Sequence, residues 1–297
     1  MKIKFSCVVD QNPKFGRQAF VWALTLLVYG GAETESLVIH TVGNYTGEYR
    51  KIFEDWGIEI RVVKAFDVRH PNSNKLAQLE SEALNSADYA VLCDCDISFS
   101  QDIHSWINGS SIRARIASYN GLPQAAWEEL FQSAGLTLPS GSMAALLNGA
   151  ETLPSYCNGG IYIMPRAMLQ ALKEVWPRWT RWLLDHDSLI NPFQAYADQI
   201  SFAMSCAELD TSIDHLPLEL NYDGVAKSRT LHRVIHRSEI DPLVLHYHQL
   251  NAKGRLTFTE IPSVNRQIRK INDLIRLAEQ VNYDKASLML LRERRIA

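Results

Sequence analysis

The chain has 297 residues, 46% of them apolar, so it is long enough for one large α/β domain or two smaller ones with a substantial core. Its 33 acidic and 30 basic residues give a formal net charge of −3, which provides no general basic surface for nucleic acid. The longest apolar segment, residues 19–32, is shorter than the roughly 20 residues that cross a bilayer. We therefore expect a globular protein with no nucleic-acid partner and no membrane span.

The first hundred residues alternate strand-like and helix-like patterns. Strands are expected at residues 2–9, 36–43, 58–66 and 89–93, with helical patterns between them, the last of these at 72–87. This alternation predicts right-handed βαβ crossovers and a mostly parallel sheet, whose ligands bind at the carboxyl ends of the strands. Asp10 follows the first strand and both Asp94 and Asp96 follow the fourth, so we expect these carboxylates at the ligand-binding edge.

The pattern is less regular after residue 110. Residues 110–156 place a short helix among Gly, Pro and Ser, which indicates an excursion over the sheet edge where a second substrate could sit. A strand and a long helix are expected at 157–186, a helix at 196–209, and strands at 213–223 and 242–250.

The predicted helical tail at 261–297 carries eight bases and four acids. It is either a solvated arm or a surface that contacts a membrane or a partner. We divide the chain into a domain at 1–258, with a nucleotide-binding half at about 1–100 and an acceptor-side half at about 101–258, and a helical arm at 259–297.

The five cysteines are scattered and include no Cys-x-x-Cys pair, as is typical of reduced core thiols. Cys93 and Cys95 lie two residues apart, but the other cysteines do not supply the usual spacing of a zinc site. Residues 1–10 have the length of a strand and lack a cleavage site after an apolar run, so no signal peptide is expected. These features predict a cytoplasmic location.

The segment CDCD ends a buried strand with two like charges. In an extended strand the carboxylates of Asp94 and Asp96 would share a face about 7 Å apart and repel by roughly 2 kcal/mol at an effective dielectric of about 20. A divalent cation turns this repulsion into attraction, and hard carboxylate oxygens suit Mg²⁺ or Mn²⁺ with positions left for substrate phosphates. The alternative is a helix cap, with Asp96 or Ser98 capping a helix that starts near Gln101.

Asp94 and Asp96 form a DxD motif, and four further stretches accompany it: Asn74-Lys75, CNGGIYIMPR at 157–166, YADQISF at 196–202 and VLHYHQL at 244–250. With these motifs the chain resembles the GT-A glycosyltransferases that use nucleotide-diphospho-sugars. It resembles family 8 among them most closely. The resemblance covers about residues 1–255, although the family's usual HxxGxxKPW ending is absent. It implies a Rossmann-like α/β fold with a mixed, mostly parallel sheet flanked by helices, here with a C-terminal helical extension.

The resemblance also implies an activity and a metal site. The activity is metal-dependent transfer of a sugar from a nucleoside diphosphate donor, UDP-linked in our interpretation, to an acceptor hydroxyl on a carbohydrate, lipid or protein. Asp96 would be the main ligand of Mn²⁺ or Mg²⁺ and Asp94 the second, with either His246 or His248 completing the site and His246 favoured. Both histidines are expected on one face of their strand, where they could also be a structural hydrogen-bonded pair.

Further roles follow from matching motif positions. The resemblance assigns Asp198 to a donor-sugar hydroxyl and Gln199 to the neighbourhood of the anomeric carbon. It assigns other contacts with the donor to Asp10, Lys75, Asp94, Asn158, Gly159, Gly160 and Lys253. Some of these positions also have a structural explanation: the glycines could serve a turn, Asp198 could lie beside a helix dipole, and Lys75 could be a surface lysine.

The stereochemistry and two rival functions stay open at this point. An amide follows Asp198 where an inverting enzyme commonly has an acidic pair, which favours retention, but Glu208 and Asp210 keep inversion open. A phosphatase of the haloacid dehalogenase type also uses DxD, normally after the first strand of its domain. A non-catalytic nucleotide-sugar binding protein is the other alternative.

Overall fold

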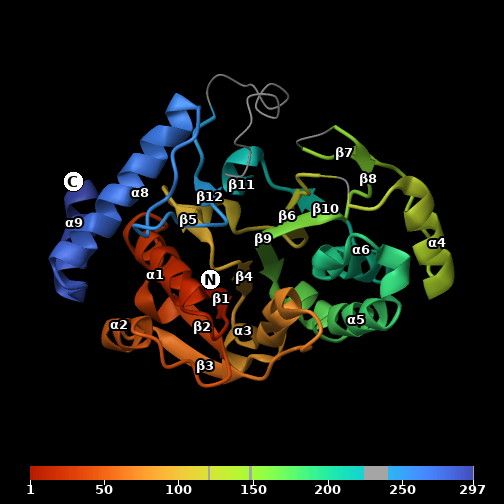
Figure 1. Ribbon diagram of the computed structural model, residues 1–297, viewed down its shortest axis with the longest axis horizontal. Helices are drawn as coiled ribbons and strands as arrows, with labels where there is room; N and C mark the ends of the chain where they lie inside the picture. The colour runs from red at the N-terminus through yellow and green to blue at the C-terminus, as the bar shows by residue number, and fades with distance from the viewer. Residues whose placement is uncertain (120, 147–148, 224–239, 297) are drawn as a thin grey trace.

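A computed structural model describes residues 1–119, 121–146, 149–223 and 240–296 (Figure 1). The strands are β1 (Ile3–Val9), β2 (Leu37–Val42), β3 (Glu59–Val63), β4 (Tyr89–Cys93), β5 (Ile97–Phe99), β6 (Ile112–Ile116), β7 (Met143–Ala144), β8 (Glu151–Thr152), β9 (Cys157–Pro165), β10 (Ile213–His215), β11 (Tyr222–Asp223) and β12 (Val244–His246). The α-helices are α1 (Pro13–Val28), α2 (Tyr49–Trp56), α3 (Glu82–Asn85), α4 (Gln124–Ala134), α5 (Arg166–Asp185), α6 (Ala197–Glu208), α8 (Pro262–Gln280) and α9 (Lys285–Ile296). Short 3₁₀ helices are η1 (Thr34–Ser36), η2 (Pro71–Glu80), η3 (His104–Trp106), η4 (Asp187–Ile190), η5 (Gln194–Tyr196) and η6 (Leu218–Leu220).

A seven-stranded sheet forms the centre of the molecule, in the order β10-β6-β9-β4-β1-β2-β3 (Figure 1). Strands β4, β1, β2 and β3 pair in parallel with one another. Strand β9 runs antiparallel to both β4 and β6. A smaller sheet pairs β11 with β12 in parallel and β12 with β5 in the antiparallel sense. The mixed, mostly parallel sheet flanked by helices confirms the predicted fold class.

Alternate residues of β4 face two different layers of helices, as the twofold period of a strand requires. Val91 and Cys93 join the apolar cluster that includes α1 and α8. Ala90 and Leu92 join a second cluster that includes residues of α5 and α6. A third cluster lies among α4, α5 and α6, away from the first.

The sequence of helix α1 explains where the helix begins and why it is buried. The side chain of Asn12 accepts a hydrogen bond from the Lys14 amide at 2.9 Å, and Pro13 occupies the first turn, where its missing N–H costs nothing. Most of the helix is buried, because the sheet covers one side and α8 packs on another.

The C-terminal segment is helical, as predicted, but α8 is not a solvated arm. Val264, Ile268, Ile271 and Ile275 are spaced by four, three and four residues, which gives one apolar face. That face is buried in the same cluster as α1. No helix within the described ranges is both long and apolar enough to cross a membrane.

Four segments differ from the expected elements. The predicted helix at 72–87 is 3₁₀ helix η2 followed by the single turn α3, because Ser73 and Asn74 hydrogen-bond to residues outside the helix. The predicted strand at 213–223 is split into β10, η6 and β11 by Pro217, which lacks the N–H that a ladder needs.

The DCD motif also differs from the expectation. Asp94 to Asp96 form a turn between β4 and β5 instead of continuing an extended strand, and β5 takes the place of a helix capped by Asp96 or Ser98. The strand expected at 242–250 covers only Val244–His246, and His248 has a left-handed backbone with φ of 56°.

One prediction concerns His40, which is fully buried on β2. Its Nδ1 lies 2.9 Å from the Ser6 hydroxyl, and burial lowers its pKa to about 4. The unfolded chain therefore binds a proton near pH 6.5 that the folded chain does not, so acidification between pH 6.5 and 4 destabilises the fold. From pH 7 to pH 5 this histidine should remove about 2 kcal/mol of stability. Urea unfolding at both pH values should show a smaller loss in His40→Gln, and an equal loss in both proteins would contradict the assignment.

Candidate active site

Backbone pairing brings three chain segments, the DCD turn, the start of β9 and the end of β12, to one edge of the sheet. Because β9 runs antiparallel to β4, its first residues lie at the carboxyl end of β4, where the Asp94 amide donates to the Gly160 carbonyl at 3.0 Å. His246 on β12 is in register with Ile97 on β5, and the Tyr247 amide donates to the Asp96 carbonyl at 3.1 Å. These backbone contacts fix the DCD turn against the residues of β9 and β12.

A cavity of about 690 Å³ opens at this edge. Its lining contains most of the predicted site residues: Asp10, Lys75, Asp94, Asp96, Asn158, Gly159, Asp198, Gln199, His246 and His248. Gly160 lies directly behind this lining, since a Cβ there would come within 2.6 Å of His246 Nδ1. Lys253 does not line this cavity, but two neighbouring ones.

Lys75 forms a bridge between two carboxylates that are far apart in sequence. Its Nζ lies 2.7 Å from Asp94 Oδ1 and 3.1 Å from Asp198 Oδ2. Burial alone would lower the pKa of Lys75, but the charges of Asp198 and Asp94 outweigh it and raise the pKa well above its usual value. Gly159 makes room for this bridge, because a Cβ at that position would lie 2.5 Å from Lys75 Nζ. Lys75 is therefore a permanent cation inside the site and not a surface lysine.

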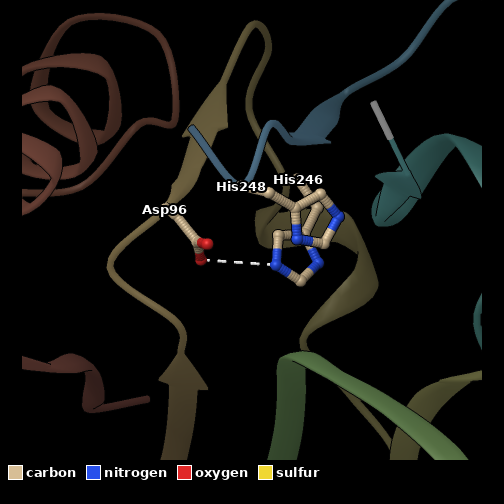
Figure 2. Close-up of side chains that lie close together, drawn as sticks. All are labelled: Asp96, His246 and His248. Atoms are coloured by element: carbon tan, nitrogen blue, oxygen red, sulfur yellow. Dashed lines mark ion pairs between the residues drawn. The ribbon is translucent and has the colours of Figure 1, made fainter. Parts of the chain in front are cut away.

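His246 lies between the DCD turn and Asn158. Its Nε2 is 3.3 Å from Asp96 Oδ1 and 3.9 Å from Asp94 Oδ2 (Figure 2 shows the contact with Asp96). Its Nδ1 is 3.2 Å from Asn158 Oδ1. The imidazole thus faces both carboxylates of the DxD motif with one nitrogen.

The three charged groups of this cluster shift one another's pKa values. Burial opposes a charge on Asp96, but the nearby His246 lowers the pKa of Asp96. The converse holds for His246, whose pKa is raised by Asp96 against the effect of burial. For Asp94, burial and the repulsion from Asp96 raise the pKa despite Lys75. Each of these charges therefore depends on the others at this edge of the sheet.

Asp223 is a site residue that was not singled out from the sequence. Its Oδ1 lies 2.9 Å from His248 Nε2, and its Oδ2 accepts a hydrogen bond from Ser118 Oγ at 2.5 Å. Burial would raise the pKa of Asp223, but the bond with His248 lowers it far below its usual value. The only signal in the sequence was an acid at the end of the expected strand at 213–223.

The donor atoms fit a divalent cation. Asp96, His246 and His248 each offer one ligand atom, and these atoms lie within 4.8 Å of one another in the part of the chain that the structure describes. A carboxylate and imidazoles are common ligands of divalent transition metals.

Residues 7–210 match the family model described as the Rhodobacterales glycosyltransferase domain. The chain belongs to this glycosyltransferase family. No curated protein matches it. The enzyme is similar in fold to an active-site mutant of LgtC, at 11% identity and a TM-score of 0.55 over 92% of this chain and 95% of that one.

Two other solved structures support the same fold. The galactosyltransferase LgtC in complex with donor and acceptor sugar analogues is 12% identical, with a TM-score of 0.54 over 91% of this chain and 94% of that one. The glycosyltransferase GlyE of Streptococcus pneumoniae TIGR4 is 10% identical, with a TM-score of 0.54 over 91% of this chain and 61% of that one. The enzyme is a glycosyltransferase with a GT-A fold similar to that of LgtC, which favours transfer over the phosphatase reaction.

The Lys75 bridge generates a prediction about stability. Lys75→Met leaves Asp198, which is only 2% exposed, without its cation, and breaking a buried ion pair should cost about 3 kcal/mol in the free energy of unfolding. Urea denaturation measures this loss. The double variant Lys75→Met/Asp198→Asn should recover more than half of it, because the stranded charge is gone.

A matched control is Lys51→Met, which removes an exposed lysine paired with Asp55. It should change stability by less than about 0.5 kcal/mol. If Lys75→Met were no more destabilising than Lys51→Met, Lys75 would not neutralise the buried carboxylates.

Proposed function

We propose that the enzyme transfers a sugar from a nucleoside diphosphate donor, a UDP-sugar, to an acceptor hydroxyl, and that it uses a divalent cation and retains the anomeric configuration. One observation carries this proposal: a single cavity combines the DxD carboxylates and two histidines with Lys75, which joins Asp94 to Asp198.

The donor would bind along the sheet edge from β1 to β9. Asn74 Nδ2 donates to Asp10 Oδ2 at 3.0 Å, which orients that carboxylate at the end of β1 toward the base of the nucleotide. Lys75 supplies positive charge for phosphate or sugar oxygens. At Asn158 and Gly159 the backbone lines the cavity, and the missing side chain of Gly159 lets a sugar approach closely.

Asp96, Asp94 and either His246 or His248 would hold the cation, for which we propose Mn²⁺ or Mg²⁺. Once bound, the ion would act as a Lewis acid on the departing diphosphate, a contribution of several kcal/mol in other enzymes. Lys253, which the resemblance connects with the same diphosphate, lines the adjoining cavity of about 610 Å³. Gln249 lines both cavities, so the two cavities adjoin at this residue.

The residues near the sugar favour retention. Asp198 is fixed at the start of α6, where its carbonyl accepts a hydrogen bond from Trp176 Nε1 at 2.8 Å, and Gln199 follows it in the cavity lining. An amide cannot take the acceptor proton, which would pass instead to the leaving phosphate oxygen. Glu208, a candidate base for inversion, is engaged by Trp179 Nε1 at 2.6 Å, and neither it nor Asp210 lines this cavity.

For the acceptor we propose a carbohydrate. LgtC has been solved with an acceptor sugar analogue, and the cavity here is lined by four aromatic residues, Tyr119, Tyr156, Phe193 and Tyr196. Aromatic rings present flat apolar faces beside hydroxyl groups that can hydrogen-bond. A lipid-linked or protein-linked sugar would present the same chemistry. We further infer a cytoplasmic location, since all five cysteines are buried and unpaired.

The first test concerns the cation. Asp96→Asn should abolish Mn²⁺-dependent binding of UDP in calorimetry, since it removes the carboxylate beside His246, and Asp94→Asn should weaken the binding. Neither variant removes a core contact, so circular dichroism should show an intact fold. UDP binding that is insensitive both to Asp96→Asn and to a chelator would refute the metal site.

The second test concerns stereochemistry. A thermal-shift panel of UDP-sugars with Mn²⁺ identifies the donor, since a ligand of the folded state raises its melting temperature. Proton NMR of the first product should then show the same anomeric configuration as the donor. Gln199→Ala should lower turnover more than donor affinity, and Asp198→Ala should lower both. An inverted product would refute retention and leave the fold and metal proposals intact.

A further inference from the structure

The two histidines of the site have nearly parallel, stacked rings. Their centroids are 4.0 Å apart and their planes differ by 24°. Figure 2 shows both rings with a nitrogen on the side of Asp96. The stacking brings both rings to the cation site, and the hydrogen bonds of each ring show which of its nitrogens is free to bind a cation.

The hydrogen bonds of Asn158 determine which nitrogen of His246 is free. Asn158 Oδ1 accepts from the Gly160 amide at 3.0 Å and from Asn221 Nδ2 at 2.8 Å. An amide N–H can only donate, so this atom of Asn158 is the acceptor oxygen. The Nδ1 of His246, 3.2 Å away, must then carry the hydrogen, and its Nε2 is the nitrogen that faces Asp96 with a lone pair in the neutral ring.

The same reasoning applies to His248 with the nitrogens exchanged. Asp223 Oδ1 is 2.9 Å from His248 Nε2, and the Ser118 hydroxyl donates to the other carboxylate oxygen. Behind Ser118 lies the buried guanidinium of Arg115, whose Nη2 donates to Ser118 Oγ at 2.9 Å. Arg115 donates to Ser118 and Ser118 donates to Asp223, so this chain of donors ends on the carboxylate of Asp223, which accepts. His248 Nε2 must donate, so Nδ1 is left as the potential ligand atom.

The backbone of His248 is also held in place. Its carbonyl accepts a hydrogen bond from Gln18 Nε2 on α1 at 2.9 Å, and its φ of 56° is uncommon for a residue other than glycine or asparagine. This conformation places the ring against that of His246 after the strand has ended.

We propose that His248 is a second imidazole ligand of the cation, through Nδ1, beside His246 and Asp96, and that Asp223 is the positioning residue that holds it. Carboxylate–histidine–metal arrangements of this kind orient the ring and increase the basicity of the ligand nitrogen. The inference rests on the proposed cation site and deepens it, because the requirement for one histidine becomes a requirement for two.

A second imidazole changes which ions the site prefers. Mg²⁺ favours oxygen ligands and keeps much of its water, whereas imidazole suits later transition metals such as Co²⁺ and Zn²⁺ better. The ratio of Co²⁺ affinity to Mg²⁺ affinity should therefore be higher in the wild type than in a variant without His248.

The test counts imidazoles directly. Pulsed EPR of the protein loaded with Mn²⁺ and UDP resolves the nitrogen couplings of bound imidazoles, and we expect two in the wild type. His248→Asn should show one, and asparagine tolerates the left-handed backbone at this position. Asp223→Ala should lower Mn²⁺ affinity about 10-fold to 100-fold. His186→Gln, at the exposed end of α5, is the matched control and should keep both couplings.

The outcomes separate this inference from the function on which it rests. One coupled imidazole in the wild type, unchanged by His248→Asn, overturns the second ligand while the cation site stands. Loss of turnover in His248→Asn with two couplings retained also overturns it, and assigns the Asp223–His248 pair to proton transfer. If Mn²⁺ does not bind to the wild type with UDP, the proposed cation site itself fails. Circular dichroism on each variant excludes unfolding as the cause.

Discussion

The structure depends on neutralising negative charge that the sheet collects at one edge. Five aspartates line a single cavity, at positions 10, 94, 96, 198 and 223. Carboxylates this close and this poorly hydrated cannot all stay ionised without compensating donors. Asn74 donates to Asp10, and Lys75 joins Asp94 to Asp198. His246 faces Asp96, and His248 faces Asp223. The positions of these donors, and of the short strands that carry them, follow from this requirement.

The sequence predicted the half of the site that depends on local pattern. Strand and helix alternate clearly through the first hundred residues, and acids directly after β1 and β4 must meet at one edge of a parallel sheet. The link from Lys75 to Asp198 was less accessible. It depends on 3₁₀ helix η2 and on the start of α6, which are more than a hundred residues apart, and only the family resemblance placed both near the donor.

The other half could not be predicted because tertiary contacts determine it. Asp223 and His248 meet through strands of two and three residues, which are too short to leave a periodic pattern. The left-handed backbone of His248 has no signature in the neighbouring residues, so the expected strand was extended too far. For α8, spacing revealed an apolar face but not its partner α1, and the excess of basic residues suggested more solvent exposure than the packing allows.

The walls of the cavity rest on separate apolar clusters. Phe15, Cys93 and Cys95 belong to or pack on the cluster built around α1, whereas Tyr156 and Phe193 belong to or pack on the one among α4, α5 and α6. Packing changes usually propagate through residues in contact and add independently when the sites are far apart. Substitutions around Tyr156 and Phe193 can therefore accumulate, in natural divergence or directed evolution, without repacking the apolar residues beneath the DCD turn. The two sides of the cavity can therefore change in sequence independently of each other.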